Sequence, residues 1–351
     1  MPKFKKLTVS EIIKETDRAV SIAFDIPKEL SSDFKFIAGQ YITIKITIDN
    51  KELRRSYSIC SSPESNEFRV MVKEVKNGVF SNYATKKLNK GDVLEVSPPE
   101  GKFILQTTTS NQKHYAAFAS GSGITPVISM IKSVLIKETH SRFILVYGNK
   151  SAKETIFKSE IDALLLRYPE RFFVQYVFSK KIIDNAILGR IDKSVVNLIV
   201  KNKFKNTTFD GFYLCGPEEM INNVTATLKE NDVPLSKIHF ELFTSTYTSG
   251  AITAKKLDGN TTITVILDDE ETTFEMSKKK LILTAALDED LDAPYSCQGG
   301  ICSSCIAKVT EGRVVMDKNA ILSEDEISEG LILTCQAHPT TDKITINFDD
   351  V

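Results

Sequence analysis

The spacing of apolar and polar positions divides the chain into stretches of different character. In residues 1–108 apolar side chains often recur at every second position, as in Tyr41–Ile48, where isoleucines at 42, 44, 46 and 48 alternate with other residues. A period of two is typical of a strand with one buried face. Phe68–Val75 and Asp92–Val96 are further β-rich runs, and glycine and proline turns separate them. This pattern predicts a small antiparallel β-barrel.

Residues 109–243 instead alternate apolar runs with helix-like stretches. The expected strands are Tyr115–Ala119, Phe143–Tyr147, Phe172–Phe178 and Phe212–Leu214, and the expected helices are Pro126–Lys137, Lys158–Arg167 and Pro217–Glu230. Such an alternation predicts a doubly wound α/β domain with a parallel sheet. The first helix is expected to have Thr125 as its N-cap, with Pro126 at the first helical position.

The pattern of residues 244–351 predicts a linker followed by a third domain. Residues 244–260 begin with small polar side chains and lack periodicity, as linkers do. Residues 261–351 then contain three expected strands and one short helix around a cysteine-rich loop. These are the strands Thr262–Leu267, Thr272–Met276 and Lys343–Phe348, and the helix Leu281–Leu287. The chain is therefore expected to be multidomain.

Composition agrees with a multidomain globular protein. The 351 residues exceed the roughly 250–300 that share one hydrophobic core, and 42% apolar with 26% charged residues is ordinary for a folded chain. No apolar run approaches the roughly 20 residues of a membrane span, and the first residues lack the apolar stretch of a signal peptide. We therefore expect no membrane span and a cytoplasmic location.

Charge is distributed unevenly along the chain. Residues 261–351 contain 18 acidic and 7 basic side chains, a net charge of −11. The whole chain contains 46 acidic and 45 basic side chains, so residues 1–260 contain 28 acidic and 38 basic ones, a net charge of +10. One interpretation is that two modules simply differ in amino-acid composition. The other is that opposite fields help an acidic carrier module meet a basic donor surface. No basic stripe interleaved with aromatic residues is seen, so no nucleic-acid partner is expected.

Four of the six cysteines lie near the end of the chain, as Cys297-x4-Cys302-x2-Cys305-x29-Cys335. In a cytoplasmic chain such clustering favours metal ligation over disulfides. Structural zinc is the alternative, but it usually uses two ligand pairs, and only one Cys-x2-Cys pair is present. The spacing is that of plant-type [2Fe–2S] sites. The segment 295–305 resembles plant-type ferredoxins, which implies a β-grasp fold and the four cysteines as cluster ligands.

Arg55-Ser56-Tyr57-Ser58 resembles the Arg-x-Tyr-Ser motif of the ferredoxin–NADP⁺ reductase superfamily. An arginine can pair with a flavin pyrophosphate, a tyrosine offers a ring face, and a serine can donate to the isoalloxazine edge. Gly78-Val79-Phe80-Ser81 lies where that superfamily places its second phosphate-binding turn, and this turn favours FAD over FMN. The resemblance also implies cofactor contacts from Met71, Val72 and Lys73.

Gly121-Ser122-Gly123-Ile124-Thr125-Pro126 resembles the nucleotide-binding turn of the same superfamily. Glycines let a pyrophosphate approach the backbone, and a helix N-terminus favours its negative charge. Cys215-Gly216-Pro217 follows the last expected strand of the α/β domain, at the edge of the sheet where ligands bind.

The resemblance further implies roles for single side chains of residues 1–243. Ser58, Thr125 and Cys215 are expected near the reacting atoms of the nicotinamide and the flavin, and Glu241 and Phe243 near the isoalloxazine. Ser179-Lys180-Lys181 stands where NADP-dependent relatives place a Ser-Arg pair on the 2′-phosphate. Lysine lacks the bidentate geometry of arginine, so NADPH and NADH both remain candidates.

The order of the modules is similar to that of the reductase components of multicomponent oxygenases, in particular that of phenylacetyl-CoA epoxidase. This resemblance implies an NAD(P)H-dependent iron–sulfur flavoprotein that passes electrons through FAD and a [2Fe–2S] cluster to an oxygenase. Three alternatives stay open. They are a reductase for an alkane, steroid or fatty-acyl oxygenase or desaturase, a flavin reductase or redox sensor with a non-catalytic ferredoxin module, and a non-catalytic electron carrier.

Overall fold

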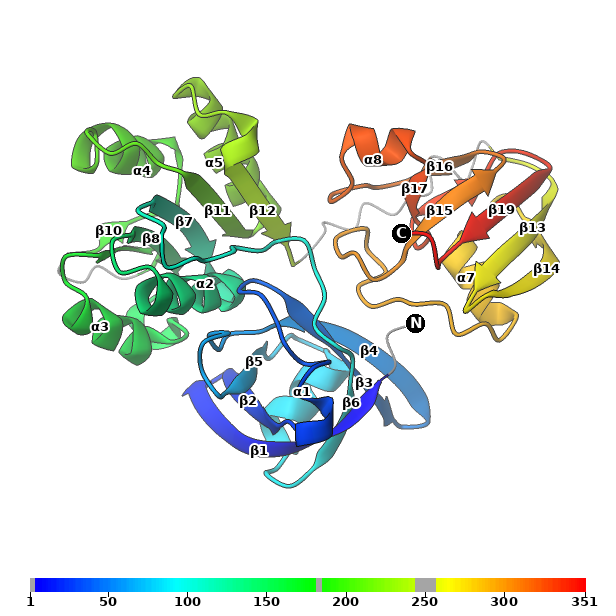
Figure 1. The fold of residues 1–351 in the computed structure, drawn as a ribbon, viewed down its shortest axis with the longest axis horizontal. Coiled ribbons are helices and arrows are strands. Elements are labelled where there is room, and N and C mark those ends of the chain that lie inside the picture. Colours follow the sequence, from blue (N-terminus) through cyan, green and yellow to red (C-terminus); the bar gives the residue numbers. More distant parts are fainter. Residues whose placement is uncertain (1–3, 181–184, 244–256) are drawn as a thin grey trace. The chain divides into compact units, whose positions relative to one another are not determined.

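The computed structural model describes residues 4–180, 185–243 and 257–351. Its contacts divide the described chain into two compact units, Phe4–Phe243 and residues 257–351 (Figure 1). Most of the predicted linker, residues 244–256, lies outside the described residues. Within the described ranges, no helix has both the length and the apolar character that a membrane crossing requires.

An antiparallel β-barrel forms the first half of the larger unit. Its strands lie in the order β4-β3-β6-β1-β2-β5, and an isolated bridge between Ile59 and Val70 joins the end of β4 to β5. The strands are β1 (Lys5–Thr16), β2 (Ala19–Asp25), β3 (Tyr41–Ile48), β4 (Lys51–Ser58), β5 (Phe68–Lys73) and β6 (Val93–Val96), with helix α1 (Val79–Lys86) after β5. The pattern of residues 41–48 thus correctly predicted β3.

The predicted burial of β3 is only partly right. Ile42 and Ile44 are fully buried, as the alternation predicts, but Thr43 between them is 2% exposed as well. Its hydroxyl lies 3.2 Å from that of Ser56, and its N–H donates to the Ser97 hydroxyl at 2.9 Å. Hydrogen-bond partners let a polar residue be buried on the second face, so a period of two does not always mean one exposed face.

A six-stranded parallel sheet forms the second half of this unit, in the order β10-β9-β8-β7-β11-β12 (Figure 1). The strands are β7 (His114–Ser120), β8 (Arg142–Asn149), β9 (Phe172–Phe178), β10 (Ile187–Leu188), β11 (Gly211–Gly216) and β12 (Ile238–Leu242); the helices are α2 (Ile124–Lys137), α3 (Lys158–Arg167), α4 (Lys193–Asn197) and α5 (Glu218–Glu230). Since the chain moves outward from β7 in one direction and later adds β11 on its other side, the strand order reverses between β7 and β11. Ligands of such sheets bind at this reversal, beyond the carboxyl ends of the strands.

The smaller unit is a β-grasp-like α+β domain. Its mixed sheet has the order β14-β13-β19-β15-β17, and β16 pairs with β18 beside it. The elements are β13 (Asn260–Leu267), β14 (Glu270–Ser277), α7 (Ile282–Asp288), β15 (Ile306–Glu311), β16 (Val314–Met316), α8 (Glu324–Ser328), β17 (Leu331–Leu333), β18 (Ala337–Pro339) and β19 (Lys343–Asn347). Cys305, at the end of the cysteine-rich loop, and Cys335, after β17, belong to its buried core.

Candidate functional site

The candidate flavin motif occupies the last half of β4. Tyr57 packs against Phe80 of α1, with 5.5 Å between ring centroids, so the two flavin motifs predicted from distant segments contact each other. Arg55 is exposed, whereas Ser58 at the end of the strand is 5% exposed. Desolvation by burial raises the pKa of the Tyr57 hydroxyl, which keeps it neutral.

The predicted phosphate-binding turn is the N-terminus of α1, with Gly78 as its N-cap. A Cβ added to Gly78 would lie 2.4 Å from the Ser81 hydroxyl oxygen, so a larger residue would displace that hydroxyl. The Ser81 hydroxyl in turn accepts from the Val75 N–H at 3.1 Å. The first N–H groups of a helix, here beginning at Val79, have no partner inside the helix, which makes this N-terminus suitable for a pyrophosphate.

Strand β5 carries the three candidate cofactor contacts Met71, Val72 and Lys73, of which only Lys73 directs its side chain toward a candidate binding turn. Met71 and Val72 are 3% and 0% exposed and pack in the cores, so contact with a cofactor would have to come from their backbone. Lys73 instead directs its ammonium toward the nucleotide turn, 3.5 Å from where a Cβ on Gly121 would be. Desolvation and the neighbouring Lys150 lower the pKa of Lys73. A cation in such a position is suited to an anionic ligand.

The nucleotide turn differs from the prediction at one point. Gly121–Gly123 forms a 3₁₀ turn that leads directly into α2, which begins at Ile124 with Gly123 as N-cap. The prediction that Thr125 is the N-cap is therefore wrong, because the turn before it is already helical. The Thr125 hydroxyl donates to the Ser122 carbonyl at 2.6 Å. Pro126 is tolerated because the first turn of a helix needs no N–H donors.

Close packing joins this turn to the end of β11. A Cβ on Gly123 would lie 2.1 Å from the carbonyl oxygen of Cys215, and one on Gly216 would lie 3.1 Å from the Ser120 Cβ. Pro217 follows as the N-cap of α5. The two candidate nicotinamide segments therefore lie against each other at the strand-order reversal of the parallel sheet.

Three candidate catalytic residues from different elements meet at this place. Cys215 and Glu241 are partners in the parallel register of β11 and β12, and the Ser58 hydroxyl donates to Glu241 Oε2 at 3.3 Å. Desolvation by burial raises the pKa of Glu241 to about 8, and burial together with Glu241 raises the pKa of Cys215 well above its ordinary value. The site thus combines a neutral thiol, a carboxyl group that holds its proton and a hydroxyl. Phe243 packs against the adjoining core.

The candidate 2′-phosphate segment lies at the carboxyl end of β9. The Ser179 N–H donates to the Asn149 carbonyl at 3.0 Å, and the Lys180 N–H to the Lys150 carbonyl at 3.0 Å. Both Ser179 and Lys180 are exposed, and Lys181 lies outside the described residues.

Sequence reasoning missed Tyr147, whose buried hydroxyl donates to the Gly121 carbonyl at 2.9 Å and supports the nucleotide turn. Its place near the carboxyl end of β8 was the available signal.

The four candidate ligand cysteines converge in the smaller unit. Side-chain hydrogen bonds from Cys302 and Cys335 lower the pKa of Cys297, and one from Cys335 lowers the pKa of Cys305. Cys335, distant in sequence, is therefore within hydrogen-bonding reach of two loop cysteines. Among the residues that the structure describes, no group of three or more His, Cys, Asp or Glu side chains is placed to hold a single metal ion. Three cysteines in Cys-x4-Cys-x2-Cys spacing with a fourth distant in sequence fit a two-iron cluster better than zinc.

The loop around these sulfurs supplies polar hydrogens, as cluster sites do. The Gly299 N–H donates to Cys297 Sγ at 3.3 Å, and the Gln336 amide to Cys335 Sγ at 3.8 Å. Gly300 has a φ of 69°, at which a side chain is strained, and a Cβ there would lie 2.9 Å from the Gln336 Cγ and 3.1 Å from the Lys318 carbonyl oxygen. His338 is not available as a ligand, because its ring nitrogens contact Asp317 Oδ2 and the Lys280 carbonyl at 3.1 and 3.2 Å.

Comparison with known families assigns the three parts of the chain. Residues 6–104 match the oxidoreductase FAD-binding domain, residues 118–226 the oxidoreductase NAD-binding domain, and residues 265–340 the 2Fe-2S iron-sulfur cluster binding domain. These matches agree with the predicted cofactors, FAD, a nicotinamide nucleotide and a [2Fe–2S] cluster. They also confirm the predicted fold classes of the three modules.

Full-length relatives share this organisation. The chain is 35% identical to one of the subunits of 1,2-phenylacetyl-CoA epoxidase of Escherichia coli (strain K12), with 99% of each chain covered. It is 33% identical to the ferredoxin reductase component of 3-ketosteroid-9-alpha-monooxygenase of Rhodococcus rhodochrous, with 97% of this chain and 96% of that protein covered. Among solved structures, phthalate dioxygenase reductase has the same fold, with a TM-score of 0.61, 22% identity and 98% of each chain covered. The chain therefore belongs to the family of iron–sulfur flavoprotein reductases that are the electron-donating components of oxygenases.

Proposed function

We propose that this reductase passes electrons from NAD(P)H to an oxygenase that acts on an acyl-CoA, as phenylacetyl-CoA epoxidase does. The observation that carries the proposal is the similarity to a component of that epoxidase over nearly the whole chain. The similarity to the steroid monooxygenase reductase extends over almost as much of the chain, so a steroid oxygenase is the main competing acceptor.

Each part of the chain has a separate task in this proposal. When bound, FAD accepts a hydride from the nicotinamide and the [2Fe–2S] cluster carries single electrons onward. Arg55 and the N-terminus of α1 hold the flavin pyrophosphate, while Gly121–Gly123 and Lys73 hold that of the nicotinamide nucleotide. Ser58, Cys215 and Glu241 line the place where the two rings meet, and Thr125 holds the turn beside it. The four cysteines hold the cluster.

The neutral state of Glu241 suits this task. A hydride carries negative charge toward the flavin, and an ionised carboxylate beside the reacting rings would oppose that transfer. Burial raises the pKa of Glu241 to about 8, so it stays protonated near neutral pH. Because the Ser58 hydroxyl donates to Glu241 Oε2, the proton of Glu241 is then the hydrogen-bond donor available to the ring system.

We infer that the protein is cytoplasmic. All six cysteines are free thiols in the structure, and four of them are needed as thiolate ligands. A reducing compartment keeps such thiols from forming disulfides.

Coupled turnover tests the proposed acceptor. The purified reductase is mixed with NADPH and the oxygenase component of phenylacetyl-CoA epoxidase, and epoxide formation is measured against NADPH consumed. A steroid oxygenase serves as the comparison. Tight coupling to the epoxidase alone supports the proposal, and tight coupling to the steroid oxygenase alone contradicts it.

Replacing Glu241 with glutamine should alter how stability depends on pH. The carboxyl of Glu241 has an ordinary pKa of 4.5 when unfolded and about 8 when folded. Between these values the unfolded state releases a proton that the folded state keeps, so the parent protein loses stability as pH rises. Glu241→Gln lacks this loss. We expect its melting temperature, measured at pH 5, 6, 7 and 8, to rise steadily relative to that of the parent; a constant difference would show that Glu241 is ionised in the fold.

Removing the lysine pair should separate the two coenzymes. We expect Lys180→Ala combined with Lys181→Ala to lower kcat/KM for NADPH by roughly tenfold, the value of one charged hydrogen bond, and to leave that for NADH nearly unchanged. Steady-state ferricyanide reduction measures both. Replacing the exposed Lys229 of α5 with alanine is the control for loss of surface charge. Equal losses for both coenzymes would show that neither lysine contacts the 2′-phosphate.

A further inference from the structure

Helix α2 connects the nucleotide turn to the segment that leaves the flavin strand. It begins directly after Gly123, and farther along it the Ser129 hydroxyl donates to the Ser61 carbonyl at 2.6 Å. The Lys132 ammonium donates to the Cys60 carbonyl at 2.9 Å. Cys60 and Ser61 follow β4, which carries the flavin motif and ends at Ser58. Two hydrogen bonds thus link the parallel-sheet half of this unit to the backbone of the barrel half.

Both donors of these bonds are shielded from water. Ser129 is 0% exposed, and the Lys132 side chain is 12% exposed and forms an ion pair with Glu160 of α3 at 2.5 Å. A buried carbonyl that loses its donor costs more than an average hydrogen bond contributes. The pair of bonds therefore resists displacement of α2 along the barrel.

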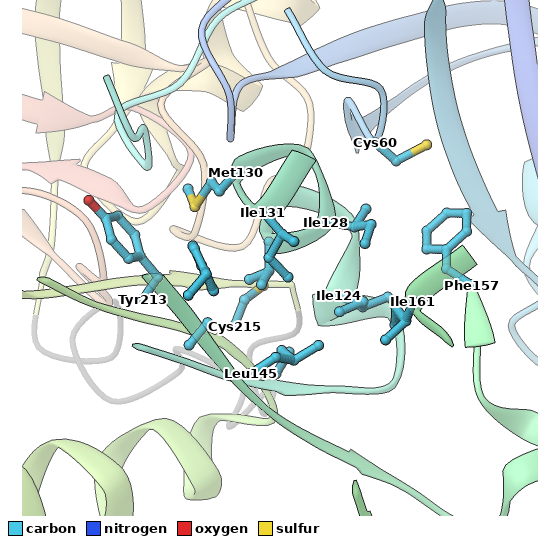
Figure 2. Packing of buried hydrophobic residues seen from close by; sticks show 14 of the residues in the cluster. Cys60, Ile124, Ile128, Met130, Ile131, Leu145, Phe157, Ile161, Tyr213 and Cys215 are labelled. Atoms are coloured by element: carbon cyan, nitrogen blue, oxygen red, sulfur yellow. The ribbon is translucent and has the colours of Figure 1, made fainter. Parts of the chain in front are cut away.

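Apolar packing reinforces the same contact. Cys60 of the barrel half and Ile124, Ile128 and Ile131 of α2 belong to one buried cluster, part of which Figure 2 shows. The fit is close enough that a Cβ on Gly39, in the barrel half, would lie 2.5 Å from the Met130 terminal methyl carbon. The side chains of α2 leave little room for a shift.

We propose that Ser129 and Lys132 are positioning residues for hydride transfer, which set the nicotinamide-binding turn relative to the flavin-binding strand. This inference rests on the proposed roles of those two segments. Ser129 lies six positions after Gly123, about 9 Å along a helix that moves as one rigid element. On the other side Ser61 lies only three positions after Ser58. A shift at the two hydrogen bonds would therefore change the position of the nicotinamide relative to that of the flavin.

Neither residue is assigned a contact with a cofactor, which makes the inference testable without disturbing the binding residues. Misplacing reacting groups by about 1 Å can slow a reaction roughly 100-fold. Ser133 of α2 also donates to Glu64 Oε1 of the barrel half at 3.0 Å, so the loss of one hydrogen bond should cause a smaller shift. We expect Ser129→Ala and Lys132→Met each to slow flavin reduction at saturating NADH by roughly tenfold, with FAD content unchanged.

Anaerobic stopped-flow measurement of flavin reduction in the full-length protein is the test. Two variants separate positioning from other effects. Glu160→Gln removes the ion pair but leaves Lys132 free to bond Cys60, and Thr227→Val removes a buried hydroxyl that bonds only within α5, to the Asn223 carbonyl at 2.8 Å. Neither should slow flavin reduction. Photoreduction of FAD, followed by electron transfer to the cluster, should be unaffected in all four variants because it does not involve the nicotinamide.

The outcomes distinguish the inference from the proposed function. Slow reduction in Ser129→Ala and Lys132→Met, with normal FAD content and normal rates in the controls, supports positioning. Unchanged reduction rates with a lowered melting temperature would show a purely structural role and overturn the inference while leaving the proposed function intact. A parent protein that NAD(P)H fails to reduce would overturn both.

Discussion

Replacing Cys335 with alanine is expected to abolish electron transfer beyond the flavin while leaving flavin reduction intact. Cys335 is 2% exposed, and its sulfur lies close enough to those of Cys297 and Cys305 to lower their pKa values, so it completes the group of four sulfurs. Three ligands on the remaining loop do not satisfy two irons. The parent should contain about two irons and two labile sulfides per chain, and the variant close to none.

The two compact units make this loss local. Cys335 lies in the unit that contains residues 257–351, whereas the proposed flavin and nicotinamide residues lie in Phe4–Phe243. The variant should therefore keep its FAD and reduce ferricyanide with NAD(P)H at about the parent rate. Reduction of cytochrome c, or turnover of a coupled oxygenase, should fall by roughly 100-fold or more, because the one-electron carrier is missing.

Cys60→Ala is the matched control, because it removes a buried cysteine outside the group of four. It should keep its iron and its transfer to cytochrome c. If a cluster-free Cys335→Ala protein still supported full oxygenase turnover, electrons would leave from the flavin. The ferredoxin module would then serve for docking or structure, as one of the alternatives from the sequence proposes.

Replacing Gly123 with alanine is expected to disable the nicotinamide site selectively. The new methyl group would lie 2.1 Å from the Cys215 carbonyl oxygen, 2.4 Å from its carbon and 2.9 Å from the Gly216 nitrogen. All three are backbone atoms, which cannot rotate away as a side chain can. The nucleotide turn and the end of β11 must separate, and a displacement of about 1 Å at reacting groups costs roughly 100-fold in rate.

Rate measurements at several NADH concentrations should locate this defect. We expect kcat/KM for NADH to fall roughly 100-fold, while FAD content and chemical reduction of the cluster stay normal. Gly211→Ala is the control: it lies at the opposite end of β11, where the atoms nearest to the added Cβ belong to the Tyr213 side chain, the first at 3.1 Å. A Gly123→Ala protein with the parent kcat/KM would show that the nicotinamide does not bind where these two segments meet.

Local sequence signals predicted most of the elements correctly. The limits of α3 and β9 agree with the structure at both ends, because strand and helix periodicities were uninterrupted there. Other elements were not predicted. Register shifts and charged residues obscure the alternation in β1, β2 is buried on both faces and shows no alternation, and α1 was expected only as a turn. Glycine and proline at the nucleotide turn suggested where α2 begins, but Thr125 was mistaken for its N-cap.

The sequence by itself determined which chemistry the chain carries. Ligand spacing within one loop is a local property, so the three cysteines of residues 297–305 could be assigned a [2Fe–2S] cluster without a structure. Motifs of a few adjacent residues likewise indicated the flavin and nicotinamide turns, since backbone groups within one turn bind the phosphates. The family comparisons agree with these cofactors.

Only the tertiary structure decided how these groups face one another. Ser58 and Glu241 are 183 positions apart, and Ser129 and Ser61 are 68 apart, yet each pair shares a hydrogen bond. Neither contact leaves a periodic signal, because it depends on how a barrel packs against one helix and one sheet edge. The raised pKa of Glu241 arises in the same way, since burial is a property of the packed chain and not of the residue. The spacing of ligands and motif residues along the sequence indicates which cofactors bind, and long-range packing determines the geometry in which they would react.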